Sequence, residues 1–437
     1  MGGVVVARGL RGFADGFVSV LLAGYLSGLG FSPFQVGAIV TGTLVGSAAV
    51  TLGVGVLAGG RAHRTVLLAA SGLMAATGIG FVVAQGFWPV LLVAVAGTLN
   101  PTAGDVSVFL PLEQALLADR VDAAARPHVY ARYNLVGSLA GAVGALASVL
   151  PDRISDATGW ALTSTQRLGF VVYVLVAAAV ALLYRRLPRT PGPVPLPSTA
   201  AAPATTPADG AAHPAPLPRP SRRPRRIVVE LAAMFSLDSA GSGLATTSLV
   251  VLWLHLRFDL DTATTGAVFF AAGLLTGLSQ LLAAPLARRI GLIRTMSFTH
   301  LPANAALAAA AFAPSAPVAI GLLLVRASLQ QMDVPARQAF VMAVVPPEER
   351  AAAASITNVP RSLASATTPL LAGALLTRST FGWPLLLAGL AKGAYDIALL
   401  RRFGQVPDGV RPPPVDAPAE PAGPPAPTAG GRSSADG

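Results

Sequence analysis

The sequence predicts an all-α polytopic membrane protein with twelve transmembrane helices in two pseudo-symmetric six-helix bundles. Of its 437 residues, 53% are hydrophobic and 12% are charged, and the mean hydropathy is +0.63. A soluble domain has about 25% charged residues, so this composition needs lipid as its solvent. Long apolar runs recur from end to end, and motifs in the first half of the chain recur in the second.

Twelve apolar segments reach the length of about 20 residues that a membrane-spanning helix needs. The predicted spans of the first half are 9–28, 36–58, 65–85, 90–117, 130–150 and 168–187. Those of the second half are 227–254, 265–287, 294–313, 317–345, 351–377 and 383–402.

Two segments rich in proline and alanine separate and follow the spans. Residues 188–226 and 405–437 are too poor in large apolar side chains to form a core, so we expect both to be disordered. The predicted bundles are therefore 1–187 and 227–404, joined by the first segment as a linker and followed by the second as a tail.

The net charge of +11 comes almost entirely from arginine, and most arginines fall in short gaps between apolar runs. If the spans alternate in direction, these gaps lie on one side of the membrane. The positive-inside rule then places both termini, the linker and the tail in the cytoplasm, and the spans in the cytoplasmic (plasma) membrane. Because the arginines lie between spans and not on one soluble face, we expect no nucleic-acid partner.

The residue inventory excludes several kinds of chemistry. There is no cysteine, and the five histidines lack metal-ligand spacing, so neither a metal nor another cofactor is expected. No phosphate loop, nucleophile elbow or His-Glu-x-x-His pair is present, so an enzyme is not expected.

An internal repeat relates the two halves. Ser32, Pro33 and Gln35 form a helix-start signal, with a cap, a first-turn proline and a capping-box partner, and Asp261 can cap the corresponding span of the second half. At an offset of 228 residues, three polar positions of the fourth span match three of the tenth, and their spacing predicts one helical face in each. These positions are Thr98, Thr102 and Asp105, matched by Arg326, Gln330 and Asp333.

Two loops carry the resemblance to a known family. The segments Gly55-Val-Leu-Ala-Gly-Gly-Arg-Ala-His-Arg64 and Ala284-Pro-Leu-Ala-Arg-Arg-Ile-Gly-Leu-Ile-Arg294 follow the second and eighth spans. With two six-helix halves and a central linker, the chain resembles the major facilitator superfamily over residues 6–404. The resemblance implies alternating-access transport and a cytoplasmic gating role for Gly55, Arg61, Arg64, Arg289, Gly291 and Arg294, although Gly59 and Arg288 replace the acid of the family motif.

Two acids fall near the middle of the first and seventh spans. Asp15 and Asp238 each cost about 2.5–3.5 kcal/mol to insert, which a functional cavity would offset. They are predicted to bind protons or contact substrate, and the alternative is a hydrogen bond to a neighbouring helix.

Arg326 is the predicted intramembrane cation of the tenth span. It needs an acidic partner, for which we consider Asp15, Asp105 or a substrate carboxylate, and a structural ion pair is an equal alternative. Thr98, Thr102 and Asp105 are expected to line the same cavity, opposite Gln330 and Asp333.

Three further patterns have structural interpretations. Lys392 and Asp396 are predicted to pair within one helix at i and i+4. Glu113 is interpreted as a solvated gate or loop contact. Gly137, Gly141 and Gly144 partly match an efflux-associated motif, but helix packing is the preferred interpretation.

The function indicated is secondary active transport of a small organic solute, with protons as the coupling ion and export as the favoured direction. Uptake by a symporter of the same fold is one alternative. A membrane receptor or sensor that binds its ligand without moving it is another.

Overall fold

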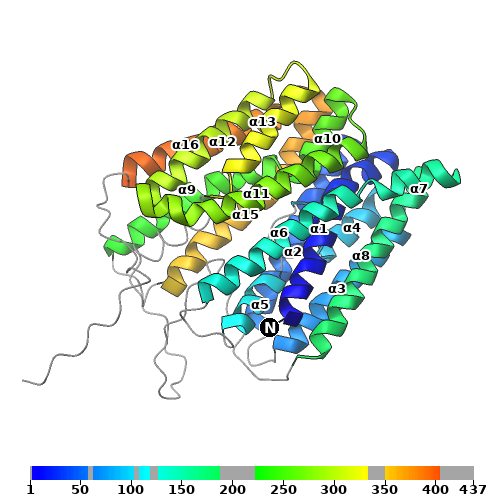
Figure 1. The fold of residues 1–437 in the computed structure, drawn as a ribbon, viewed down its shortest axis with the longest axis horizontal. Coiled ribbons are helices and arrows are strands. Elements are labelled where there is room, and N and C mark those ends of the chain that lie inside the picture. The colour runs from blue at the N-terminus through cyan, green and yellow to red at the C-terminus, as the bar shows by residue number, and fades with distance from the viewer. Residues whose placement is uncertain are drawn as a thin grey trace, which may run out of the picture. The chain divides into compact units, whose positions relative to one another are not determined.

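A computed structural model describes residues 2–57, 63–102, 108–118, 126–187, 222–332 and 350–403, and the regular structure in these ranges is helical throughout (Figure 1). Within these ranges, six helices are long and apolar enough to cross a membrane. A seventh is added if two helices joined at a 44° bend count as one span. The all-helical polytopic fold is therefore confirmed.

A helix overlaps each predicted span of the first half. These helices are α1 (Gly2–Gly28), α2 (Pro33–Leu57), α3 (His63–Val83), α4 (Phe87–Ala96), α5 (Phe109–Ala118), α6 (Arg126–Ala147), α7 (Leu150–Thr158) and α8 (Leu162–Arg185).

The second half follows the same pattern. Its helices are α9 (Arg222–Leu244), α10 (Thr247–Phe258), α11 (Thr262–Ile290), α12 (Leu292–Ala310), α13 (Ala316–Leu329), α15 (Arg350–Arg378) and α16 (Trp383–Phe403). The helix α9 begins inside the last residues of the predicted linker. The predicted tail and most of the linker lie outside the described residues, so the division into domains stays a prediction.

The predicted helix starts are confirmed. The backbone N–H of Ser32 donates to Gln35 Oε1 at 2.9 Å, and that of Gln35 donates to Ser32 Oγ at 3.3 Å, which is a reciprocal capping box. Asp261 accepts a hydrogen bond from Thr264 N–H at 2.8 Å. Hydrogen bonding from the Thr264 side chain, and then from its backbone N–H, lowers the pKa of the Asp261 carboxyl below its usual value.

The predicted span 90–117, in which Asn100-Pro101 was expected only to loosen the helix, is instead broken. The helix α4 ends at Ala96, residues 97–102 are not helical, and α5 begins at Phe109. Pro101 has no N–H to continue a helix, and Thr98 N–H donates instead to Thr77 Oγ1 at 3.2 Å. Thr98 and Thr102 therefore do not share a helical face, contrary to the stripe predicted for this span.

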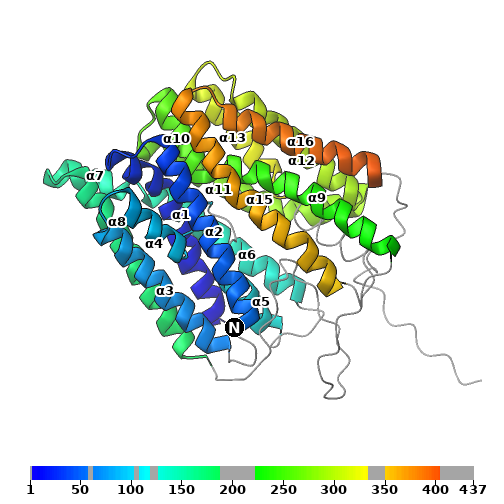
Figure 2. The same ribbon diagram turned by 180° about the vertical axis from the view of Figure 1, so that it is seen from behind.

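Helices of the two halves contact one another in two matching pairs, α2 with α15 and α6 with α11 (Figure 2). Glycine makes the first contact close, because a Cβ on Gly37 would lie 2.9 Å from the Cα of Gly373 and 2.6 Å from the Pro369 carbonyl oxygen. In the second pair a Cβ on Gly273 would lie 2.7 Å from that of Ala142. Small residues thus bring the backbones of both pairs together.

Candidate functional site

Five polar side chains from three helices form a buried cluster in the second half, called here the histidine cluster. Its members are Asp238 of α9, His300 and Asn304 of α12, and Lys392 and Asp396 of α16, all at most 6% exposed. The Lys392 Nζ donates to Asp238 Oδ1 at 2.7 Å. The carboxylate of Asp396 lies 2.9 and 3.1 Å from His300 Nδ1 and accepts from Asn304 Nδ2 at 2.8 Å.

His300 lies between two carboxylates. Its Nδ1 faces Asp396, while its Nε2 is 3.9 Å from Asp238 Oδ1. Two carboxylates thus lie around this imidazole, and one of them also contacts the Lys392 ammonium group. Carboxylates beside an imidazole favour its protonated form.

Glycine lets the helices of the histidine cluster approach closely enough for these contacts. A Cβ on Gly241 would lie 2.8 Å from Lys392 Cγ, and one on Gly389 would lie 2.6 Å from the Asn304 carbonyl oxygen. Larger residues at these two positions would push α16 away from α9 and α12.

A buried apolar layer covers the histidine cluster on one side. It comprises Leu231, Phe235, Met296, Tyr395 and Leu399. Three of these positions lie about one turn nearer the predicted cytoplasmic ends of their helices than the charged residues: Phe235 before Asp238, Met296 before His300, and Leu399 after Asp396. The ring of Tyr395 meets that of His300 edge to face at a centroid distance of 6.2 Å. Water from the predicted cytoplasmic side would therefore have to cross apolar side chains.

One acid of this cluster was predicted from the sequence. Asp238 was predicted as an intramembrane acid, and its contact with Lys392 of α16 is a hydrogen bond to a neighbouring helix, the stated alternative. That the partner is a lysine was not foreseen. The predicted i, i+4 pair of Lys392 with Asp396 is wrong, because Lys392 turns to Asp238 on α9. His300 and Asn304 were missed, although an ionisable residue in an apolar span with an amide at i+4 was a usable signal.

A second buried cluster, called here the arginine cluster, lies in the first half. Arg11 of α1 pairs with Glu113 of α5, and Glu113 also accepts hydrogen bonds from the hydroxyls of Tyr133 and Tyr184. The Arg11 guanidinium lies 4.4 Å from the ring centroid of Phe109. Glu113 is 0% exposed, so its interpretation as a solvated gate is wrong.

The three glycines of α6 serve packing against α1, where the two backbones nearly touch. A Cβ on Gly16 would lie 1.9 Å from the Gly141 carbonyl oxygen, and one on Gly144 would lie 2.0 Å from that of Phe13. Gly137 leaves room for Arg8, whose Nε would be 2.3 Å from an added Cβ. These contacts support the packing interpretation over an efflux motif.

Asp15 and Thr98, both predicted site residues, lie near one tyrosine of α8. The Tyr173 hydroxyl donates to the Thr98 carbonyl oxygen at 3.5 Å, and the charge of Asp15 acts on both Tyr173 and Arg11. All are buried in the first half, so the structure gathers these two predicted residues at one place.

The break in the fourth span meets the break in the seventh. Ser248, in the first turn of α10, donates through its Oγ to the carbonyl oxygens of Ser19 and Pro101 at 2.7 and 3.2 Å. Thr247 Oγ1 donates to the Thr102 carbonyl oxygen at 3.2 Å. The second half thus satisfies carbonyl groups that the interrupted helix leaves without intrahelical partners.

Two threonine hydroxyls, one in each interrupted span, are buried without a hydrogen-bond partner among the described residues. They are Oγ1 of Thr98, in the non-helical segment 97–102, and Oγ1 of Thr246, directly before α10. Buried hydroxyls are normally paired, so an unpaired one calls for a ligand or a water.

Arg326, another predicted site residue, is partly buried in the last turns of α13. The acid whose charge acts on it is Asp238, and no described acid lies within ion-pair distance. The predicted pairing with Asp15 is therefore not found. Gln330 ends the same helix, where its N–H donates to the Arg326 carbonyl oxygen at 3.0 Å, while Asp105 and Asp333 lie outside the described residues.

Comparison with known proteins identifies the family to which this helical fold belongs. The model of the Major Facilitator Superfamily matches residues 4–329 and 231–432. The chain belongs to this superfamily. The Uncharacterized membrane protein YJR124C of Saccharomyces cerevisiae is 24% identical over 393 residues, which cover 86% of this chain and 87% of that protein.

Solved structures of superfamily transporters share the fold. A D-xylose-proton symporter superposes with a TM-score of 0.65 at 15% identity, covering 91% of this chain and 96% of its own. The nucleoside transporter NupG gives 0.65 at 14% identity, with 92% and 98% covered. The human organic anion transporter MFSD10 gives 0.58 at 18% identity, with 91% and 99% covered.

The superfamily loop motif is partly described. Gly291 separates α11 from α12 with φ +87, a conformation that glycine adopts without strain, so this position of the motif has a structural reason. Arg289 and Arg294 beside it are exposed, Arg64 is partly buried at the start of α3, and Gly55 lies in α2. Arg61 lies outside the described residues, and the gating role of this motif stays a prediction.

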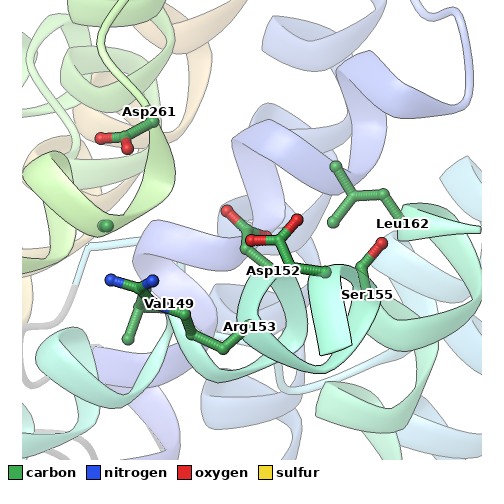
Figure 3. Close-up of a pocket in the computed structure, with 8 residues that line it drawn as sticks. Val149, Asp152, Arg153, Ser155, Leu162 and Asp261 are labelled. Carbon is green, nitrogen blue, oxygen red and sulfur yellow. The ribbon is translucent and has the colours of Figure 1, made fainter. Parts of the chain in front are cut away.

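A polar surface pocket lies elsewhere, where α7 and the start of α11 meet (Figure 3). Asp152, Arg153 and Asp261 line it, and the charge of Arg153 acts on Asp261. It contains none of the predicted pathway residues, so it is not the candidate site for this superfamily member.

Proposed function

We propose that this protein is a proton-coupled secondary transporter that moves a small organic solute by alternating access, with the solute bound where the two broken spans meet. The unpartnered hydroxyls of Thr98 and Thr246 carry this proposal. Interrupted helices in transporters mark substrate sites, because they release backbone and side-chain polar groups at membrane depth. The two small-residue helix pairs between the halves supply a surface on which the halves can rock.

Isosteric variants test the substrate site. Thr98→Val and Thr246→Val each remove one hydroxyl, and neither breaks a hydrogen bond of the described structure. We expect unchanged or slightly higher thermal stability, together with at least about a tenfold loss of solute affinity in proteoliposomes. Thr43→Val is the matched control, because the Thr43 hydroxyl already donates to the Val40 carbonyl oxygen at 2.7 Å.

For the solute we propose an organic anion, because Arg326 is an intramembrane cation without an acid at ion-pair distance in the described structure. The fold similarity to an organic anion transporter is consistent with this chemistry. A thermal-shift screen with matched carboxylates and carboxamides tests it, since a bound ligand stabilises in proportion to its occupancy. Arg326→Lys should keep the preference for carboxylates, and Arg326→Met should lose it. Equal stabilisation by both solute classes would refute the anion.

Export is the direction we favour, and uptake by proton symport is the alternative. The plasma membrane, with both termini in the cytoplasm, is the proposed location, and the bilayer, protons and the solute are the proposed partners. Proteoliposomes with the pH gradient imposed in either sense separate export, uptake and a receptor that binds without moving its ligand. A receptor would show ligand binding but neither accumulation nor counterflow.

A further inference from the structure

The proposed function requires a proton site, and the sequence analysis assigned that role to Asp15 and Asp238. The structure shows that Asp238 is neutralised by Lys392 at 2.7 Å. A carboxylate beside an ammonium group favours its charged form, so Asp238 is poorly suited to take up a proton by itself.

We propose instead that His300 is the proton-binding residue, and that the proton adds to its Nε2 nitrogen on the side facing Asp238. This inference rests on the proposed function only for the use of the proton in transport. The step is a simple addition, in which neutral imidazole becomes imidazolium and no other bond breaks.

The contacts of His300 assign the nitrogen. Nδ1 lies 2.9 Å from one oxygen of Asp396 and 3.1 Å from Asn304 Nδ2. The amide donates to the other oxygen of Asp396 at the shorter distance of 2.8 Å, and the carboxylate only accepts, so we assign the hydrogen of the neutral ring to Nδ1. Nε2 is then the basic nitrogen, and it is 3.9 Å from Asp238. An added proton therefore places an imidazolium between two carboxylates.

The charges around His300 favour this uptake. Asp396 contacts it from α16 and Asp238 lies near it on α9, while Lys392 of α16 contacts Asp238. On α13, Arg326 acts on Asp238 without reaching ion-pair distance. On α15, Arg361 is turned toward α9, where its Nε donates to Ser239 Oγ at 3.2 Å.

Two further described neighbours contribute no carboxylate. Tyr395 of α16 contributes an aromatic edge, and α11, which also packs against α12, holds no acid or histidine between Thr262 and Ile290. Among the described residues, Asp238 and Asp396 are the acids in contact with His300.

A proton on His300 would change the contacts that join α9, α12 and α16. With His300 neutral, Asp238 is tied to α16 through Lys392. With His300 charged, the same carboxylate also attracts α12. Asp238 lies on α9, about two turns before the break that holds Thr246. A shift of α9 on protonation of His300 would therefore reach the proposed solute site.

Histidine NMR on the full-length protein in detergent tests the site directly. We expect the ring signals that disappear in His300→Gln to titrate between about pH 5 and 8, and Asp396→Asn to move their midpoint downward. His255→Gln, which removes an exposed histidine, should leave that midpoint unchanged. A His300 ring that keeps one charge state over this range, or a midpoint that neither Asp396→Asn nor Asp238→Asn moves, would overturn the proposal.

A transport measurement separates this proposal from the proposed function. His300→Gln keeps hydrogen-bonding capacity and removes titration, so solute counterflow should persist while transport driven by a pH gradient falls at least about tenfold. If gradient-driven transport persists in His300→Gln, the proton site is wrong and the transporter stands. If His300 titrates as expected but no solute moves in either assay, the proposed function is wrong and the proton site stands.

Discussion

The arginine cluster and the histidine cluster are both buried and both charged, yet their composition differs in one respect. In the arginine cluster one guanidinium faces one carboxylate, and two tyrosine hydroxyls fill the remaining acceptor positions of that carboxylate. In the histidine cluster two carboxylates face one ammonium group and an imidazole. In the arginine cluster a positive and a negative charge are paired, and its described members include no histidine. We therefore expect it to hold α1 and α5 together. The histidine cluster contains an imidazole between two carboxylates, so we expect it to take up a proton.

The largest effect is expected in the arginine cluster. Glu113→Gln would leave Arg11 charged and buried without its carboxylate, and breaking such a pair costs about 3–5 kcal/mol. Thermal unfolding in detergent should show this loss equally at pH values on either side of neutrality. The double variant Arg11→Met with Glu113→Leu should recover most of the stability. A loss of stability that varied strongly with pH would show that the arginine cluster also contains a group that titrates in this range.

A smaller and pH-dependent effect is expected in the histidine cluster. Lys392→Met removes the ammonium group that contacts Asp238, and a protonated His300 can replace part of the missing charge. Because protons are bound more readily by this folded variant than by its unfolded chain, its stability should be greatest at low pH and should fall as pH rises. We expect a deficit of about 1–3 kcal/mol above neutrality, measured by unfolding across pH. Lys392→Met combined with His300→Gln should lose this pH dependence.

A single hydrogen bond in each cluster gives a finer comparison. Tyr184→Phe removes one donor to Glu113, and Asn304→Leu removes one donor to Asp396. Hydrogen bonds to charged groups contribute about 1.5–3 kcal/mol. Both variants should be destabilised to a similar degree in unfolding measurements, but only Asn304→Leu should shift the pH midpoint of His300 in NMR. A shift in Tyr184→Phe would mean that the clusters are coupled.

Local sequence signals predicted the fold well because hydropathy and capping act over short distances. The capping box of Ser32 and the cap at Asp261 are examples. The place of Asp238 near the middle of an apolar span also identified it as a buried acid. These features need no knowledge of which helices are neighbours.

Pairing across helices was not accessible in the same way. Lys392 has an acid one turn away in its own helix but contacts Asp238, which lies 154 residues away in sequence. Asp396 is bound by His300, 96 residues away. Spacing along one helix cannot decide between such partners, since the choice depends on which helices pack together. The break after Ala96 was indicated by Pro101, but the carbonyl partners that make it tolerable come from Thr247 and Ser248 in the other half.

The smallest expected effect provides a control outside both clusters. Asp261 caps α11 and lies before the membrane-spanning part of that helix, and its pKa is lowered by the hydrogen bond from Thr264. Asp261→Ala should cost about 1 kcal/mol. A carboxyl whose pKa is lowered by folding contributes stability above its unfolded pKa and loses it as pH falls through the folded value.

The deficit of Asp261→Ala should therefore be constant from about pH 5 to 8 and should shrink only below about pH 4. Unfolding curves over this range test it. This change falls below about pH 4, whereas the change expected for Lys392→Met falls near neutrality, so the two variants measured together separate a helix cap from a buried proton site. If Asp261→Ala also changed the stability profile near neutral pH, that profile could not be attributed to His300.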